Sequence, residues 1–170
     1  ERHGRSFDLP RFGGWWGHDK NTRFQMQPGF QPMEGAEGWQ LSNAPILGMS
    51  AMKAALDVFA EVGMPALREK SEKLTGYLEY TVDQLAGEFP DAQISVITPR
   101  DPAQRGCQVS IDIAGREREL FDDMIAAGVI ADFREPCVIR MAPVPLYNSF
   151  EDVYTFGKVM RELLAKGRAK

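Results

Sequence analysis

The pattern of apolar positions predicts two long helices in the first half of the chain. Residues 43–62 are apolar on almost every side, which predicts a helix that is buried on most faces. Ser42 and Asn43 are suitable caps for its first turn. From residue 64 to about residue 89 the apolar side chains recur at helical spacing, which predicts a long amphipathic helix. Its buried face is expected to carry Leu67, Leu74, Leu78, Val82 and Leu85.

After residue 90 the pattern changes to the period of strands. Apolar and polar side chains alternate over 107–113, which is typical of an antiparallel strand with one buried face. Shorter apolar runs predict three further strands, at 94–97, 129–133 and 137–141, and a tight turn joins the last two. These strands are short enough to belong to one small sheet.

Two more helices are predicted among these strands. One covers 116–127, and the other begins after Ser149, which forms a capping-box pattern with Asp152 three residues later. The tail 166–170 is expected to fray. The order from the first strand onward is β-β-α-β-β-α. It predicts an α+β fold in which helices cover a mainly antiparallel sheet, preceded by a loop and a long connecting helix.

The first 35 or so residues are rich in glycine, proline and aromatic residues but show little periodicity. A free-standing domain rarely carries so much unpatterned apolar surface. The segment is therefore predicted to be either a functional loop that packs against another surface or a piece of a larger protein. Its aromatic residues include Phe12, Trp15, Trp16, Phe24 and Phe30.

Composition and charge narrow the class of protein. The 170 residues, 44% of them hydrophobic, suffice for about one domain with an ordinary core. A net charge of -4 argues against general nucleic-acid binding, and no apolar run is long enough to cross a membrane. Cys107 and Cys137 form neither a disulfide framework nor a zinc pattern and are predicted to be buried thiols. With no signal-peptide pattern, this favours the cytoplasm.

Few residues offer recognisable chemistry. Phosphate-binding loops, dinucleotide fingerprints, zinc-protease motifs and CxxC pairs are missing from the sequence, so no metal site is predicted. His3 and His18 are too few for a complete hydrolytic site. The tryptophans of segment 13–18 either pack on the core or offer an indole N–H to a phosphate. Asn43 either caps a helix or helps that helix start to bind an anion.

Arg140 is the only cation in the apolar stretch 137–150. An unpaired guanidinium is costly to bury, so Arg140 must face a cleft and bind an anion or pair with an acid. The stretch itself contains no acid, and Asp132 on the neighbouring predicted strand is the best internal partner. The residues alone leave a ligand and an ion pair equally open.

Several segments, in order along the chain, resemble those of the kynureninase family. They are Gly-Trp-Trp-Gly-His at 14–18, Thr-Arg-Phe at 22–24, Gln-Leu-Ser-Asn-Ala-Pro-Ile-Leu at 40–47, Leu-Thr-Gly-Tyr-Leu-Glu at 74–79, Arg-Gly-Cys-Gln at 105–108 and Ile-Arg-Met-Ala-Pro-Val-Pro-Leu-Tyr-Asn-Ser-Phe at 139–150. Together they extend over nearly the whole chain. The resemblance is specific to kynureninases and not merely to enzymes that use pyridoxal 5'-phosphate (PLP).

The resemblance implies a homodimeric, fold-type-I PLP enzyme that hydrolyses L-kynurenine to anthranilate and L-alanine. Some members of the family prefer 3-hydroxykynurenine. By resemblance, Arg140 grips the substrate α-carboxylate and Trp15 reaches the cofactor phosphate across the dimer interface. Trp16 and His18 are expected near the substrate ring. Asn43 is expected to approach the cofactor or the ring substituent of the substrate.

The same resemblance implies a domain organisation. Residues 1–42 would be a loop segment on the active-site side of a large domain, and residues 43–170 would be the C-terminal small domain. Within the small domain, 43–89 would be a helical connector and 90–170 a layer of sheet and helices.

The sequence departs from the family in what it lacks. The family's Schiff-base lysine, its ring-stacking aromatic residue and its pyridinium-pairing aspartate all precede the Trp-Trp loop, and none has a counterpart in these residues. The chain is therefore expected to hold no catalytic residue and, as the C-terminal part of a kynureninase, to be inactive alone. One alternative is a stand-alone interaction domain. Another is a fold-type-I enzyme such as a cysteine desulfurase, which Cys107 and Cys137 disfavour because both lie in predicted strands.

Overall fold

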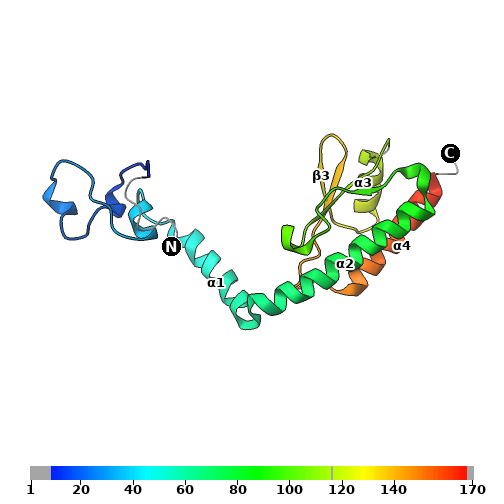
Figure 1. Ribbon diagram of the computed structural model, residues 1–170, viewed down its shortest axis with the longest axis horizontal. Coiled ribbons are helices and arrows are strands. Elements are labelled where there is room, and N and C mark those ends of the chain that lie inside the picture. Colours follow the sequence, from blue (N-terminus) through cyan, green and yellow to red (C-terminus); the bar gives the residue numbers. More distant parts are fainter. Residues whose placement is uncertain (1–8, 116, 168–170) are drawn as a thin grey trace. The chain divides into compact units, whose positions relative to one another are not determined.

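A computed structural model of the chain describes residues 9–115 and 117–167 (Figure 1). The described residues form two units, one within Glu1–Asp57 and the other within Val58–Lys170. Unit 1 contains three short 3-10 helices, Trp15–Gly17, Arg23–Gln25 and Ala36–Trp39. Helix α1 (Ile46–Val62) includes the boundary, and all the strands lie in unit 2.

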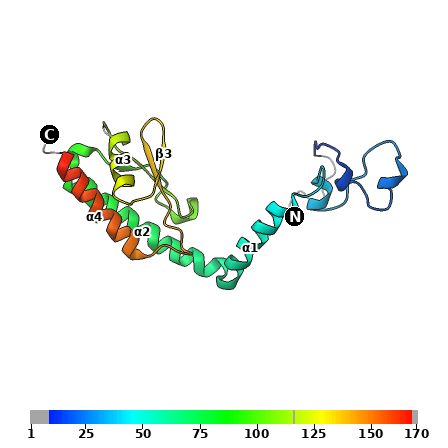
Figure 2. The ribbon, with the colours of Figure 1, turned by 180° about the vertical axis from the view of Figure 1, so that it is seen from behind.

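Helix α2 (Met64–Glu88) is the longest element of unit 2 and forms as the apolar spacing predicted. Its five expected core residues are all buried: Leu67, Leu74, Leu78, Val82 and Leu85. Helix α4 (Phe150–Gly167) packs alongside it, and Figures 1 and 2 show the two helices side by side. The inner face of α4 buries Val153, Phe156, Met160 and Leu164 against α2 and the sheet. The predicted fraying of 166–170 falls mostly on 168–170, which lie outside the described residues.

The start of α4 is fixed by the predicted capping box. The Ser149 backbone N–H donates to Asp152 Oδ2 at 2.7 Å, and the Asp152 N–H donates to Ser149 Oγ at 3.3 Å. The hydrogen bond from the Ser149 backbone, helped by one from Asn148, holds the pKa of Asp152 below its usual value. This reciprocal pair satisfies two N–H groups that the first helical turn leaves without partners.

The four predicted strands form one antiparallel sheet in the order β1-β2-β4-β3. Each strand is shorter than its pattern suggested: β1 Ser95–Val96, β2 Val109–Asp112, β3 Asp132–Arg134 and β4 Val138–Met141. Helix α3 (Glu117–Ala126) lies between β2 and β3 in the chain and is followed by Gly128 at φ +86°. Glycine tolerates this left-handed conformation, which is common just beyond a helix.

The register gives the sheet two different faces. On one face, Ile111 of β2, Ile139 of β4 and Phe133 of β3 lie opposite one another and join the core shared with α2, α3 and α4. On the other face, the partners at the next position are Ser110, Arg140 and Asp132. Because side chains alternate along a strand, the apolar face closes the core and the polar face stays outside it.

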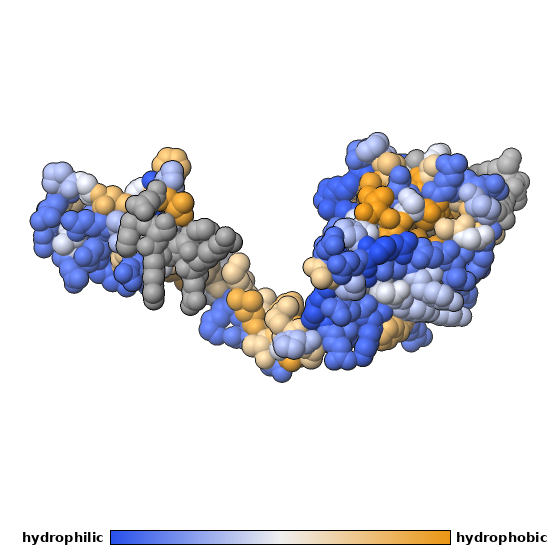
Figure 3. All heavy atoms as spheres, in the orientation of Figure 1, coloured by the Kyte–Doolittle hydropathy of each residue, from blue (hydrophilic) through white to orange (hydrophobic). Residues whose placement is uncertain are grey.

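Helix α1 differs from the sequence prediction. It begins at Ile46 and not at residue 43, and its only residue that is not exposed is Phe59, which is half-buried. Leu47, for example, is 88% exposed. The prediction of a helix buried on most faces is therefore wrong for the described residues, because none of them covers its apolar sides. Figure 3 shows these apolar side chains at the surface along α1.

The cysteines also differ from prediction. Cys107 and Cys137 are half-buried and not fully buried, since β2 and β4 each begin after the cysteine. No described helix is long and apolar enough to span a membrane.

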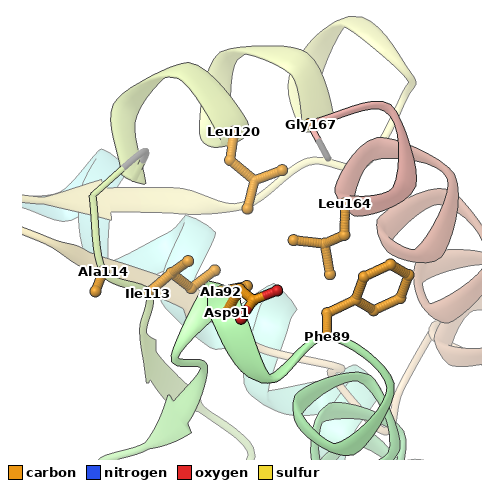
Figure 4. Close-up of a pocket in the computed structure, with 8 residues that line it drawn as sticks. All are labelled: Phe89, Asp91, Ala92, Ile113, Ala114, Leu120, Leu164 and Gly167. Carbon is orange, nitrogen blue, oxygen red and sulfur yellow. The ribbon is translucent and has the colours of Figure 1, made fainter. Parts of the chain in front are cut away.

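A small pocket of about 140 Å³ lies at the far end of the core (Figure 4). Phe89, Ile113, Leu120 and Leu164 supply most of its apolar lining, and Asp91 contributes a carboxylate. None of the residues predicted for the functional site lines it, so it is a packing feature of unit 2 and not the candidate site.

Helices α2 and α4 approach each other closely at Gly157, and this contact allows a test of the packing. A Cβ at this position would lie 2.6 Å from Thr81 Cγ2, whereas a Cβ at Gly76 of α2 would meet nothing within 4 Å. Gly157→Ala is expected to lower the free energy of unfolding by about 1–3 kcal/mol through overpacking. The control Gly76→Ala should raise it by up to ~1 kcal/mol, because alanine favours helix. Urea denaturation measures both changes.

The same pair provides a rescue. Thr81→Ser removes the Cγ2 methyl and keeps the hydroxyl that donates to the Tyr77 carbonyl. Adding it to Gly157→Ala should recover much of the lost stability. Wild-type stability in the Gly157→Ala variant would show that the helices do not approach as described.

Candidate functional site

The Trp-Trp segment is held in unit 1 by contacts that only glycine permits. A Cβ on Gly14 would lie 2.2 Å from Leu41 Cα, and one on Gly17 would lie 2.8 Å from the Gln40 carbonyl oxygen. Backbone groups cannot move aside as a side chain can, so these two positions require glycine. The contacts bring the Trp15–Gly17 turn against the segment that leads to Asn43.

The Arg23 side chain holds the backbone of the same turn through hydrogen bonds. Its side chain is buried, with 7% of the residue exposed. Nη2 donates to the carbonyl oxygens of Trp16 at 3.1 Å and His18 at 2.9 Å. The guanidinium carbon lies 5.1 Å from the centroid of a Trp16 ring, within the range of a cation–π contact. The sequence indicated Arg23 only as part of a resembling segment. The only sequence feature that could have indicated this role is that Arg23 follows the glycine-rich turn by a few residues.

His18 is oriented by two hydrogen bonds. The Gln31 backbone N–H donates to His18 Nδ1 at 3.4 Å, and His18 Nε2 lies 3.2 Å from Thr22 Oγ1. Because Nδ1 accepts, the neutral ring carries its proton on Nε2 and donates it to Thr22. The Phe30 ring lies edge-on to His18, at 5.8 Å between centroids. His18 is therefore a fixed and largely satisfied side chain. His3 lies outside the described residues.

Trp16 and Asn43 are brought together as candidate site residues. The Trp16 indole N–H donates to Asn43 Oδ1, and both side chains line a pocket of about 540 Å³. The predicted role of Asn43 as a cap of α1 is not what the structure shows, because its side-chain oxygen accepts from Trp16 and the helix begins at Ile46. Lys20 also lines this pocket, but it is exposed and paired with Glu37 at 3.2 Å.

Trp15 and His18 line a second pocket of unit 1, of about 300 Å³. Arg23 contributes to both pockets, so the buried guanidinium lies between them. The Trp15 ring packs edge-on against Phe24, at 5.4 Å between centroids. Among the described residues no acceptor takes the Trp15 indole N–H, and 44% of the residue is exposed. That donor is thus available to a bound anion.

Arg140 lies in unit 2, on the polar face of the sheet. It is flanked by Ser110 of β2 and Asp132 of β3, its Cα partners in the two ladders. Nε donates to Asp132 Oδ2 at 2.7 Å, and Nη2 donates to the same oxygen. The ion pair that the sequence left open is therefore present. It is not sealed in the interior, because 30% of the Arg140 side chain and 46% of the Asp132 side chain are exposed.

A buried ion pair that the sequence analysis missed anchors the loop 99–106. Arg105 donates to Glu79 of α2, and their side chains are only 4% and 10% exposed. Arg105 Nη1 also donates to the carbonyl oxygens of Pro99 at 3.0 Å and Arg100 at 3.1 Å. Glu79 falls on the buried stripe of α2 beside Leu78, and an acid in such a position predicts a cationic partner.

Metal chemistry finds no support in the described part of the chain, where no three potential ligands of the His, Cys, Asp and Glu types come together. Among the residues predicted for the site, the Trp15 indole in unit 1 and the Arg140 guanidinium in unit 2 could recognise small anions.

Several solved structures share the fold of this chain. Apo cysteine desulfurase from Thermococcus onnurineus NA1 matches 98% of this chain and 42% of its own with a TM-score of 0.70 and 19% identity. A C-DES mutant with glycine covalently linked to its PLP cofactor (TM-score 0.64, 14% identity) matches 89% of this chain and 37% of its own. A NifS-like protein matches 82% of this chain and 41% of its own, with a TM-score of 0.55 and 20% identity. These neighbours share the fold of this chain and confirm the predicted α+β architecture.

The sequence comparisons identify the family. The model of the kynureninase C-terminal domain matches residues 67–160. Kynureninase from Myxococcus xanthus (strain DK1622) is 54% identical over 160 residues, which cover 94% of this chain and 37% of that protein. Kynureninase from Koribacter versatilis (strain Ellin345) is 51% identical over 156 residues, 92% of this chain and 36% of that protein. The chain belongs to the kynureninase family, and it spans a little over a third of the length of these curated relatives.

The buried pair of Arg105 and Glu79 gives a prediction with a matched control one turn along α2. Glu79→Ala should destabilise the fold by about 3–5 kcal/mol, because it leaves a buried guanidinium without its counter-charge. Asp83→Ala removes an exposed bidentate pair with Arg100, at 2.9 and 2.8 Å, and should cost only about 0–1 kcal/mol. Thermal and urea unfolding compare the two variants. Equal losses would mean that burial does not set the strength of the first pair.

Proposed function

We propose that this chain is the C-terminal part of a PLP-dependent kynureninase, a hydrolase that cleaves a carbon–carbon bond of L-kynurenine to give anthranilate and L-alanine. Support comes from identity above 50% with kynureninases along more than nine-tenths of the chain. The fold neighbours include a cysteine desulfurase, but at 19% identity it shares only the fold with this chain.

The observation that carries the proposal is the state of Arg140. Its guanidinium is partly exposed on the polar face of the sheet, and its pairing with Asp132 uses Nε and one N–H of Nη2. A guanidinium has five N–H groups, so a second edge, formed by Nη1 and Nη2, is available for a carboxylate. In the proposed enzyme this edge clamps the substrate α-carboxylate bidentately and fixes the orientation of the amino acid.

The residues of unit 1 fit the cofactor that the family uses. Trp15 presents an indole N–H without an acceptor among the described residues, as a contact to the PLP phosphate requires. Asn43 and Trp16 share one pocket and His18 lies in the neighbouring one. We assign Trp16, His18 and Asn43 to the surroundings of the substrate ring and cofactor. PLP, when bound, supplies the electron sink for the carbanion chemistry of the amino acid.

We further propose that these residues alone do not catalyse the reaction. A Schiff-base lysine must be an unpaired amine in a desolvated setting. Lys20, which lines the Trp16 pocket, is instead an exposed ammonium paired with Glu37. The chain's residues bind and orient, and the covalent chemistry belongs to the remainder of the kynureninase polypeptide. A homodimer is proposed as the active form, since half-exposed Trp15 and exposed Phe24 leave aromatic surface for a partner.

Substitution of Arg140 in the longer kynureninase polypeptide tests the proposal. Arg140→Lys should lower kcat/KM for L-kynurenine by about 10²-fold, because lysine keeps the charge but lacks the planar fork. Arg134→Lys is the control, since Arg134 pairs with the same Asp132 but is 61% exposed. It should change kcat/KM by less than about threefold. A wild-type kcat/KM in the Arg140→Lys enzyme would rule out the clamp.

A further inference from the structure

We propose that Asp132 is a positioning residue for the carboxylate clamp, which it serves by holding one edge of the Arg140 guanidinium so that the other edge stays aligned for the ligand. This inference rests on the proposed function of Arg140. A single oxygen, Asp132 Oδ2, accepts from both Nε and Nη2 of Arg140. Two hydrogen bonds to one side of a planar group fix its plane as well as its position.

The backbone explains why Asp132 can act in this way. Asp132 and Arg140 are direct Cα partners in the β3–β4 ladder, so their side chains leave the sheet on the same face. A short connection joins the two strands, which keeps this register close to the turn. The carboxylate is therefore delivered to the guanidinium by the sheet and not by a flexible loop. Ser110, the Cα partner on the other side, is too short to do the same.

Asp132 does not cancel the positive charge around the proposed clamp. Arg134 Nη2 lies 3.2 Å from the same Oδ2, so one carboxylate is shared by two guanidiniums. These three side chains together carry a net charge of +1, from two cations and one anion. An incoming carboxylate is thus still attracted after the internal pairs have formed. Arg134 offsets the negative charge of Asp132, while Asp132 orients Arg140.

Two opposite effects make the idea testable. If Asp132 only neutralised Arg140, its removal would raise the positive charge and tighten the binding of an anionic substrate. If Asp132 orients the guanidinium, its removal weakens binding although the charge increases. The sign of the change in KM therefore separates neutralisation from positioning, and misalignment of a bidentate contact is the larger effect.

The experiment uses the longer kynureninase polypeptide with Asp132→Asn and Asp132→Ala, and L-kynurenine as substrate. Inhibition by the product L-alanine provides a second readout of carboxylate binding. Asp132→Ala should raise KM and the inhibition constant of L-alanine by about tenfold or more, with kcat within roughly threefold of wild type. Asp132→Asn keeps a side-chain oxygen that can accept from Nε and Nη2, so it should raise KM less than Asp132→Ala does. A purely structural defect would instead reduce kcat through the loss of folded enzyme and leave KM unchanged. Arg134→Lys, which keeps the charge of the other partner of Asp132, should change KM by less than about threefold.

The outcomes are distinguishable from those of the function itself. A lower KM in Asp132→Ala would overturn the inference in favour of simple neutralisation. An unchanged KM in Asp132→Ala would also overturn it, while the loss of kcat/KM in Arg140→Lys would still support the clamp. If Arg140→Lys is unimpaired, the clamp and its positioning residue both fail. A raised KM in Asp132→Ala, with Arg134→Lys near wild type, supports the assignment.

Discussion

The register of β4 between β2 and β3 is the constraint on which unit 2 depends. It sends Ile139 into the core with Ile111 and Phe133, and by the alternation of strands it sends Arg140 to the opposite face. A slip by one residue would bury the guanidinium and expose the isoleucine, so the same pairing specifies both folding and the proposed ligand recognition. The core therefore does more than stabilise the domain, because it also fixes the direction in which Arg140, the proposed carboxylate clamp, points.

Much of the fold could be predicted because its signals are local. The stripe from Leu67 to Leu85 and the reciprocal pair of Ser149 and Asp152 are visible in sequence and formed as expected. The strands proved shorter than their patterns, since pairing ends where the partner strand ends and not where alternation stops. Helix α1 was predicted as a helix but wrongly as a buried one. An apolar composition indicates that the helix surface is suited to burial, but it does not indicate whether the described residues bury it.

The individual residues of the candidate site were easier to predict from the sequence than the contacts between them. Sequence reasoning named both possible partners of Arg140 and found Asp132, although it could not decide how exposed the pair would be. The bond from Trp16 to Asn43 and the support of Arg23 beneath the turn depend on close backbone approach at Gly14 and Gly17. Such contacts between distant segments leave no periodic signal. Glu79 was the missed exception, because an acid on an apolar helical stripe is visible in a helical projection.

The exposed helix α1 has a practical consequence. Its three charged residues, Lys53, Asp57 and Glu61, are spaced four apart and follow one narrow line, with Lys53 and Asp57 in an ion pair. The rest of its circumference is essentially aliphatic or aromatic. A polypeptide that leaves this helix uncovered exposes a hydrophobic surface to which chaperones, detergents and other copies of the chain can bind. The solubility of such a polypeptide during purification will therefore depend on these 17 residues more than on the well-packed sheet domain.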